Sequence, residues 1–235
     1  MRFTPNDLQE RLRVHGKENY LFIYSVMKGA VVGVAVFILI SIIHNSSAKD
    51  LAFWCKLSFW AGSFAAIIMT YYATTVGTLI WVFFPTWEDI ILPFILVLAE
   101  CFLFLVLAKP DSAARNSSDT VWYHWNLAFS IFAFVCHLML RNIYRKVHAE
   151  DYDPSLENLI AGYRKQVNND RWSSGLSALA WALVWAVWHF WLIDNYPGSV
   201  NWQWLSGIAV LILMFFVTRN QEQERKIIID AITIV

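Results

Sequence analysis

The sequence predicts an all-α integral membrane protein, a bundle of six transmembrane helices with both the N and C termini in the cytoplasm. Six apolar runs account for most of the chain: 21–43, 51–80, 90–108, 121–140, 174–193 and 203–217. A bilayer core about 30 Å thick needs roughly 20 apolar residues per helix, which most of these runs supply. In addition, 58% of the 235 residues are hydrophobic and only 15% are charged, which is too few charges for a soluble globule.

The 13 tryptophans indicate the same fold class. Many stand near the ends of the runs: Trp54, Trp81, Trp87, Trp122, Trp125, Trp172, Trp202 and Trp204. Because tryptophan concentrates at the boundary between lipid and water, the first expected partner is the lipid bilayer. The net charge of zero gives no reason to expect a nucleic acid as a partner.

Positive charge predicts the orientation of the six helices. Lysine and arginine concentrate in three segments, 1–19, 141–172 and 219–235. The loops between the other runs are short and poorer in these residues: 44–50, 109–120 and 194–202. Because cytoplasmic segments carry the excess of Lys and Arg, we expect the three basic segments on the cytoplasmic side of the cell's inner membrane.

The expected organisation follows along the chain. A cytoplasmic amphipathic helix occupies residues 1–19, where Thr4 is the cap and Pro5 the first helical residue. The remaining units are transmembrane helices 1–4 in 20–140, a cytoplasmic loop in 141–172, transmembrane helices 5 and 6 in 173–218, and a cytoplasmic tail in 219–235.

The loop 141–172 is expected to contain a second amphipathic helix. Asp153 followed by Pro154 is typical of a helix start. Apolar residues then recur at helical spacing: Leu156, Leu159, Ile160, Tyr163 and Val167. Two interpretations stay open, because this helix could lie on the bundle or the bilayer surface, or residues 150–170 could dock a cytosolic protein partner.

Three charged residues fall inside the apolar runs, where each needs a reason: Lys28, Lys56 and Glu100. Counted from the outer helix ends at 1.5 Å per residue, Lys56 lies about 8 Å deep and Glu100 about 12 Å deep. This similarity in depth predicts a Lys56–Glu100 pair. Lys28 either extends to the cytoplasmic surface or competes for Glu100. An unpaired, titratable carboxyl at that depth would instead indicate a proton or cation pathway.

Polar side chains form a stripe along the second and fourth runs. At 100° per residue, a narrow arc of the fourth run holds Asn126, Ser130, Ala133, His137 and Arg141. The second run adds hydroxyl groups at every fourth residue: Thr70, Thr74 and Thr78. Lipid excludes such a stripe, so we expect it to line a hydrated path or to join helices through hydrogen bonds. In the first interpretation Glu100 is the charge selector or the proton-binding site, and Arg141 lies at the cytoplasmic entrance of the path.

Ser25, Gly29 and Gly33 form a ridge of small residues on the first run. The Gly29–Gly33 spacing lets two helices approach closely. The contact lies within one chain or between subunits, and a homo-oligomer is expected in the second case.

Three tryptophans of the fifth run share one face: Trp181, Trp185 and Trp188. They pack in the core or against lipid, or they form an aromatic wall around a cationic or planar ligand.

Three histidines lie toward the outer side, and they are weak candidates for a metal site: His44, His124 and His189. Nothing in their spacing demands a metal, so we expect no metal and no other cofactor. The three cysteines fall inside apolar runs and are read as packing residues, because they lack a disulfide or zinc spacing.

Together these features favour a small channel or transporter with a polar seam inside the membrane. The alternative is a membrane-embedded sensor or scaffold that recruits a cytosolic protein through its inner loop and tails. We expect no enzyme activity, because no nucleophile–base pair is visible in the sequence.

Overall fold

The computed structural model describes residues 5–45, 51–80, 87–108, 117–149, 154, 157–192, 207–213 and 215–216. Five long helices form the bundle: α1 (Pro5–Asn45), α2 (Leu51–Ile80), α3 (Trp87–Leu105), α4 (Ser117–Ala149) and α5 (Glu157–Val187). A 3₁₀ turn, η1 (Val106–Ala108), continues α3, and a π-helical segment, η3 (Trp188–Leu192), continues α5. No strand occurs in these ranges, which confirms the all-helical prediction for them.

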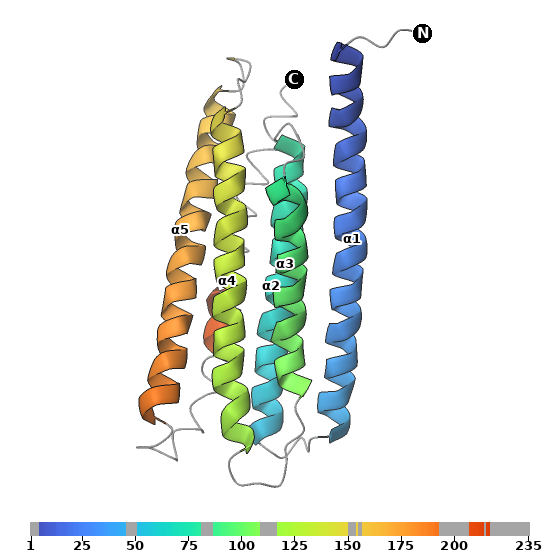
Figure 1. The fold of residues 1–235 in the computed structure, drawn as a ribbon. Coiled ribbons are helices and arrows are strands. Elements are labelled where there is room, and N and C mark those ends of the chain that lie inside the picture. The colour runs from blue at the N-terminus through green and yellow to red at the C-terminus, as the bar shows by residue number, and fades with distance from the viewer. Residues whose placement is uncertain are drawn as a thin grey trace.

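The long helices run side by side (Figure 1). Helix α1 packs on α2 and α3, helix α3 packs on α4, and α4 makes its most extensive contact with α5. The bundle therefore places α1 and α5 at opposite edges, with α2, α3 and α4 between them.

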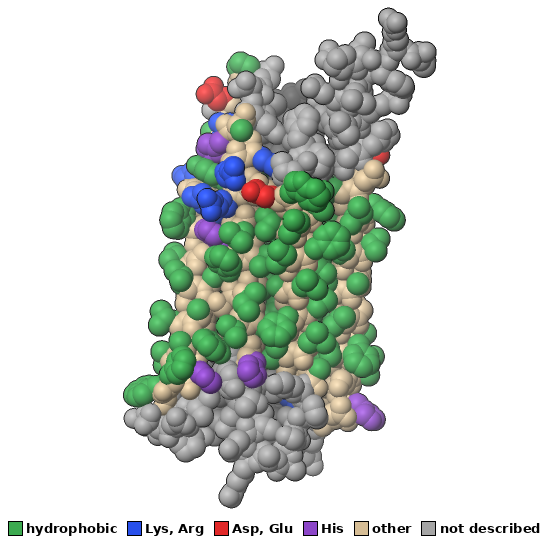
Figure 2. Space-filling view, viewed as in Figure 1, with side chains coloured by type: hydrophobic (Ala, Val, Ile, Leu, Met, Phe, Trp, Pro, Cys, Tyr) green, Lys and Arg blue, Asp and Glu red, His purple; other side chains and the backbone are tan. Residues whose placement is uncertain are grey.

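Four of the described helices are long and apolar enough to cross a membrane, as in a multi-pass membrane protein: Glu18–Asn45, Phe53–Thr75, Trp87–Ala108 and His124–Ala149. Many of their large apolar side chains face outward; Phe22, Phe37 and Leu98 are about 70% exposed. Figure 2 shows these side chains covering the middle of one face, with charged groups gathered toward one end. An apolar surface of this extent is suited to lipid rather than water.

Four of the six predicted membrane-spanning helices occur as helices long and apolar enough to cross a membrane, and the count of six stays a prediction. The fifth apolar run lies in α5 and η3, which are not among the four. Most of the sixth run, along with the tail 219–235, lies outside the described residues. The side chains of 1–17 lie outside them too, although α1 begins at Pro5.

Helix α1 packs through a narrow seam. Its buried residues alternate at spacings of four and three: Tyr24, Lys28, Val31, Ala35, Ile38 and Ile42. This is the spacing that keeps one face of a helix against a neighbour in a left-handed bundle. Trp60 of α2 fixes the seam by donating from Nε1 to the Ala35 carbonyl at 2.8 Å. A lysine therefore occupies a core position of the first helix.

Helices α4 and α5 form a hairpin that extends past the apolar runs. The Arg164 guanidinium donates to the Val147 carbonyl from Nε at 3.1 Å and from Nη2 at 2.8 Å, which caps the end of α4. Beside this cap a small apolar cluster joins the helices: Ile143 and Val147 with Ile160 and Val167. Residues 157–172 thus belong to the same helix as the fifth apolar run, rather than to a separate helix in a loop.

Candidate functional site

The most buried polar group of the bundle joins three helices. Lys28 of α1 forms an ion pair with Glu100 of α3, and both are almost fully buried. Thr70 of α2 lies between them, with its Oγ1 2.9 Å from Lys28 Nζ and 2.8 Å from Glu100 Oε1. We call these three residues the Lys28–Thr70–Glu100 cluster. A buried ion pair is stable only when further hydrogen bonds satisfy its charges, and Thr70 supplies one.

The Thr70 hydroxyl can be rearranged. It accepts from the Lys28 ammonium and has a single proton to donate. Two acceptors lie within reach of that proton, Glu100 Oε1 at 2.8 Å and the Ile67 carbonyl of its own helix at 2.9 Å. A change of charge at Glu100 can therefore be answered by rotation of one hydroxyl, without movement of a helix.

Tyr24 and Thr74 form a second polar layer next to the cluster. The Tyr24 hydroxyl lies 3.4 Å from the Thr70 carbonyl, and Thr74 Oγ1 lies 3.2 Å from the Tyr24 hydroxyl. The Lys28 ammonium lies 5.1 Å from the centre of the Tyr24 ring, close enough for a cation–π contact. Tyr24 also stacks on Tyr71 with ring centres 6.0 Å apart.

One oxygen of the Glu100 carboxylate stands apart from this network. Lys28 and Thr70 both contact Oε1 of Glu100, and no group in the described part of the chain donates to Oε2, although it is buried. Leaving a buried carboxylate oxygen without a donor costs free energy, so native proteins rarely do it without a function. Oε2 is therefore available to a proton, a cation or a ligand donor.

The predicted Lys56–Glu100 pair is wrong. Lys56 precedes Thr70 by 14 residues in α2, which is about 21 Å along the helix axis, and Thr70 is the residue that contacts Glu100. The prediction assumed that the outer ends of α2 and α3 lie at one level. Instead α2 extends well past the end of α3 at Leu105, which leaves Lys56 buried near the Leu51 end of α2.

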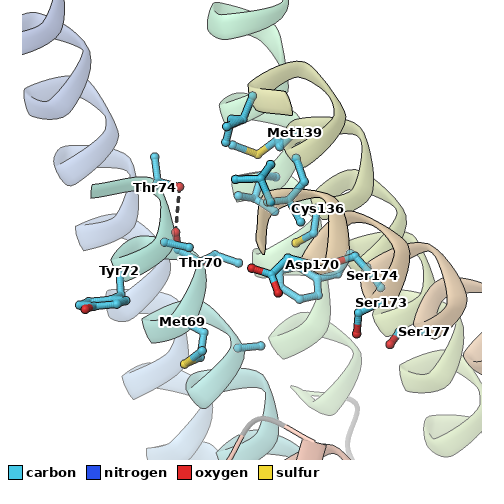
Figure 3. A pocket seen from close by; sticks show the side chains of 18 of the residues that line it. Met69, Thr70, Tyr72, Thr74, Cys136, Met139, Asp170, Ser173, Ser174 and Ser177 are labelled. Carbon is cyan, nitrogen blue, oxygen red and sulfur yellow. Dashed lines mark hydrogen bonds between the residues drawn. The ribbon is translucent and has the colours of Figure 1, made fainter. Parts of the chain in front are cut away.

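A cavity of about 160 Å³ lies next to the cluster, between α2, α4, α5 and Leu213. Thr70 and Thr74 line it from α2, so Thr70 belongs both to the cavity and to the cluster. Figure 3 shows Asp170 of α5 reaching into the cavity from the side opposite to Thr70. Of the predicted polar residues, only the two threonines contribute side-chain oxygens to this wall.

Asp170 is the acidic group of the cavity. Its Oδ1 accepts a hydrogen bond from Gln166 Nε2 at 3.3 Å, one turn earlier in α5. Asp170 precedes the apolar part of α5, and burial raises the pKa of its carboxyl from 3.8 to about 6. Three hydroxyls of the same helix also line the cavity: Ser173, Ser174 and Ser177. Asp170 and these serines were not among the predicted site residues, although an acidic residue followed by three serines on one helix was a visible signal.

Ser130 and His137 of the polar stripe on α4 contact the backbone of α5 and do not line this cavity. Ser130 Oγ donates to the Ala178 carbonyl at 2.8 Å, and His137 Nδ1 lies 2.8 Å from the Arg171 carbonyl. Of the other predicted members, Asn126 is buried, whereas Arg141 is exposed. Ser130 and His137 thus join two helices by hydrogen bonds, which was the second of the two interpretations.

The close approach of α4 and α5 depends on Gly175. A Cβ atom at this position would lie 2.9 Å from His137 Nδ1 and 3.3 Å from Cε1 of the same ring. Any larger residue would therefore displace the imidazole from the Arg171 carbonyl.

The ridge of small residues on α1 is not covered within the chain. A Cβ atom added at Gly29 or Gly33 would meet nothing within 4 Å among the described residues. Ser25 is also exposed, with its Oγ 3.4 Å from the Tyr71 hydroxyl. Self-association through this ridge stays a prediction.

The three tryptophans of α5 do not share one environment. Trp181 is buried, and its ring packs edge-on against Trp125 and Phe129, with centres 6.0 and 5.5 Å away. Trp185 stacks on His189 at 5.5 Å. Trp188 lies half-buried in η3. Trp181 is thus a core residue, and the aromatic ligand wall stays a prediction.

The three outer histidines lie on different helices: His44 on α1, His124 on α4 and His189 on η3. Within the described ranges, no three His, Cys, Asp or Glu side chains gather as metal ligands. Two other predicted sites lie outside those ranges, in whole or in part. They are the Thr78 side chain and residues 150–153 and 155–156 of the expected partner-docking segment.

A second buried ionic group was missed. Asp89 of α3 accepts from Asn142 Nδ2 at 2.9 Å and forms an ion pair with Lys146 of α4. Asp89 directly precedes the third apolar run, and Lys146 falls in the segment 141–172 expected to be a cytoplasmic loop, so neither was a candidate site residue. Asn142 and Lys146 stand one helical turn apart, and this spacing was the signal that could have identified them as a pair of donors to one acidic side chain.

No protein-family model matches the chain, and comparisons with curated proteins and with solved structures give no match either. A function is therefore inferred from the residues of the site.

Proposed function

We propose that this protein is a small membrane transport protein, a channel or carrier for protons or other cations, with the Lys28–Thr70–Glu100 cluster as its central site. The observation that carries the proposal is the buried Glu100 carboxylate, whose Oε2 has no donor in the described part of the chain. Ionisable groups inside a membrane-spanning helix are expensive and typically mark ion or proton pathways.

The cluster supplies two states that a carrier needs. In the first, Glu100 is ionised and Lys28 ties α1 to α3 through it. In the second, a proton binds at Oε2 and cancels the negative charge, so the Lys28 ammonium loses its partner. The buried ammonium is then unfavourable, and the α1–α3 contact weakens. Protonation at one atom thereby biases the packing of an edge helix.

The cavity supports the proposal because it provides space beside the charged site. Thr70 is common to both, so a molecule or ion in the cavity contacts the residue that binds both Lys28 and Glu100. The alternative interpretation, in which the cluster only holds the helices together, predicts the same folded bundle without transport.

The alternative role as a scaffold has less support. The apolar face of the segment expected to dock a partner includes Ile160 and Val167, which are packed against Ile143 and Val147 of α4. That face is used inside the chain. Recruitment of a cytosolic protein through 150–170 stays a prediction.

The test is proton flux into liposomes that contain the purified protein and a trapped pH-sensitive dye, driven by a potassium diffusion potential. We expect wild-type liposomes to acidify faster than empty ones and the Glu100→Gln variant to match the empty ones. Glu88→Gln is the control, because Glu88 lies on the same helix but is about half exposed and pairs with Arg145 at 3.7 Å. A Glu100→Gln variant that transports at the wild-type rate would contradict the proposal.

A further inference from the structure

We propose that the cavity between α2, α4 and α5 binds a small organic cation, an amine with an apolar body the size of one six-membered ring, with its ammonium group at Asp170. As a ligand site it stands on the cavity alone. As the identity of the transported substrate it rests on the proposed function.

The volume sets the size of the ligand. The cavity measures about 160 Å³. A cavity of about 150 Å³ in a protein interior holds one benzene molecule. The site therefore fits one ring or a short branched chain plus an ammonium group.

The walls divide by chemistry. Apolar side chains from α2 and α4 line one part, among them Met69, Phe129, Phe132 and Met139. Methionine and phenylalanine suit a flat or aliphatic body, because both make close dispersion contacts and Met adapts its shape. Asp170 and three serine hydroxyls lie on the α5 side, and Thr70 and Thr74 add hydroxyls from α2. Such a division is typical of a site for a molecule with one apolar and one polar end.

The charge of Asp170 indicates that the polar end of the ligand is cationic. Asp170 accepts a hydrogen bond from Gln166 and forms no ion pair with any described lysine or arginine. The neighbouring Arg171 is used elsewhere, since it lies over the Tyr144 ring at 4.7 Å and donates to Asn168 at 2.7 Å. A carboxylate that faces a cavity without a cation favours a cationic ligand, and an ammonium group has three donors for it and for nearby hydroxyls.

The test is binding of benzylamine, which is charged at neutral pH, to the full chain in phosphatidylcholine nanodiscs. Isothermal titration calorimetry measures it, with empty nanodiscs as the blank. Benzyl alcohol, of the same size but neutral, measures the part of the affinity that does not depend on charge. We expect benzylamine to bind more tightly than the alcohol and Asp170→Asn to weaken the amine about tenfold or more while leaving the alcohol unchanged. Glu157→Gln, on the exposed start of α5, is the control and leaves both affinities unchanged.

A second variant guards against misfolding of the first. Ala133→Leu fills the cavity from α4 without changing any charge, so it removes binding of both ligands. Equal affinity for amine and alcohol, or an Asp170→Asn variant that binds the amine like wild type, would overturn the inference. Binding without proton flux would refute the proposed function and leave the ligand site standing. Flux without binding would refute the ligand site alone.

Discussion

Removal of the Lys28 ammonium is the perturbation whose cost can be worked out most fully. In Lys28→Met the side chain keeps nearly the same length, but the Glu100 carboxylate is left buried with Thr70 as its remaining donor among the described residues. Breaking one partner of a buried ion pair typically costs about 3–5 kcal/mol. The variant can limit this cost by taking up a proton, which for an ordinary glutamic acid at pH 7 costs about 4 kcal/mol. We therefore expect Lys28→Met to lower the free energy of unfolding by about 3–4 kcal/mol at pH 7.

The loss of stability in Lys28→Met depends on pH and is coupled to the charge of Glu100. Each unit by which the pH falls makes protonation about 1.4 kcal/mol cheaper, so the penalty shrinks to about 1 kcal/mol at pH 5. In the double variant Lys28→Met with Glu100→Gln, no buried charge remains, and the loss is about 1 kcal/mol. The two single variants therefore do not add. Their coupling energy is at least about 2–3 kcal/mol, and the loss caused by Glu100→Gln alone, which leaves the Lys28 ammonium without its partner, adds to it.

The assay is reversible unfolding in mixed micelles of a mild detergent and dodecyl sulfate, followed by tryptophan fluorescence at pH 5 and pH 7. Arg145→Met is the control, since its pair with Glu88 is exposed and contributes at most about 1 kcal/mol. Single variants whose losses add in the double variant, or a Lys28→Met loss that is equal at both pH values, would refute the account of the cluster.

Three further predictions concern other parts of the bundle. Asp170→Asn raises the free energy of unfolding at pH 7.5 by at most about 3 kcal/mol, which corresponds to the rise in the pKa of Asp170 from 3.8 to about 6. Above pH 6 the folded state bears the full cost of the ionised carboxyl and below pH 4 it bears none, so the stabilisation by Asn disappears between these pH values. A stabilisation that persists at pH 4 would contradict this prediction. Gly175→Ala lowers the free energy of unfolding by about 1–3 kcal/mol because the added Cβ displaces His137. Gly162→Ala on the same helix meets nothing within 4 Å and raises the free energy of unfolding by up to about 1 kcal/mol. The opposite order of the two variants in the same micelle assay would refute the α4–α5 contact. Gly33→Leu leaves the free energy of unfolding of the single chain within about 0.5 kcal/mol of wild type, because the space beside Gly33 on α1 is open. If the ridge joins subunits, the same variant lowers self-association in sedimentation measurements. A large loss of stability would show that the ridge is covered within the chain.

Much of the fold follows from the sequence because lipid imposes strict rules. Apolar length predicts the four helices that can cross a membrane, and the cost of buried charge predicts that Lys28 and Glu100 do not face lipid. The hydroxyl series on the second run correctly brings Thr70 and Thr74 into a polar environment.

The pairing of charges does not follow from the sequence, because it depends on how far neighbouring helices slide and rotate against each other. Depths counted from loop positions placed Lys56 beside Glu100, but the α2 helix extends past α3 and brings Thr70 to that level instead. The alternating spacing of the buried face of α1, which contains Lys28, carried the information that depth did not.

The boundary of the inner loop could not be predicted for a related reason. Helical spacing of apolar residues predicts a helix over residues 154–167, but it does not show where that helix ends. No proline interrupts residues 157–187, so the amphipathic segment and the fifth apolar run form one helix. Asp170 and its serines fall in the middle of that helix, which is how they come to face α2 and α4.

Cysteine cross-linking tests the central claim, that Lys28 of α1 and Glu100 of α3 meet inside the bundle, most directly. In a background with the three native cysteines replaced by serine, the pair Lys28→Cys and Glu100→Cys is treated in native membranes with a bifunctional thiol reagent whose spacer matches the reach of a Lys–Glu ion pair, and is compared with Lys56→Cys and Glu100→Cys. We predict a cross-link in the first pair and none in the second. A cross-link between positions 56 and 100, with none between 28 and 100, would contradict the structure on which both proposals rest.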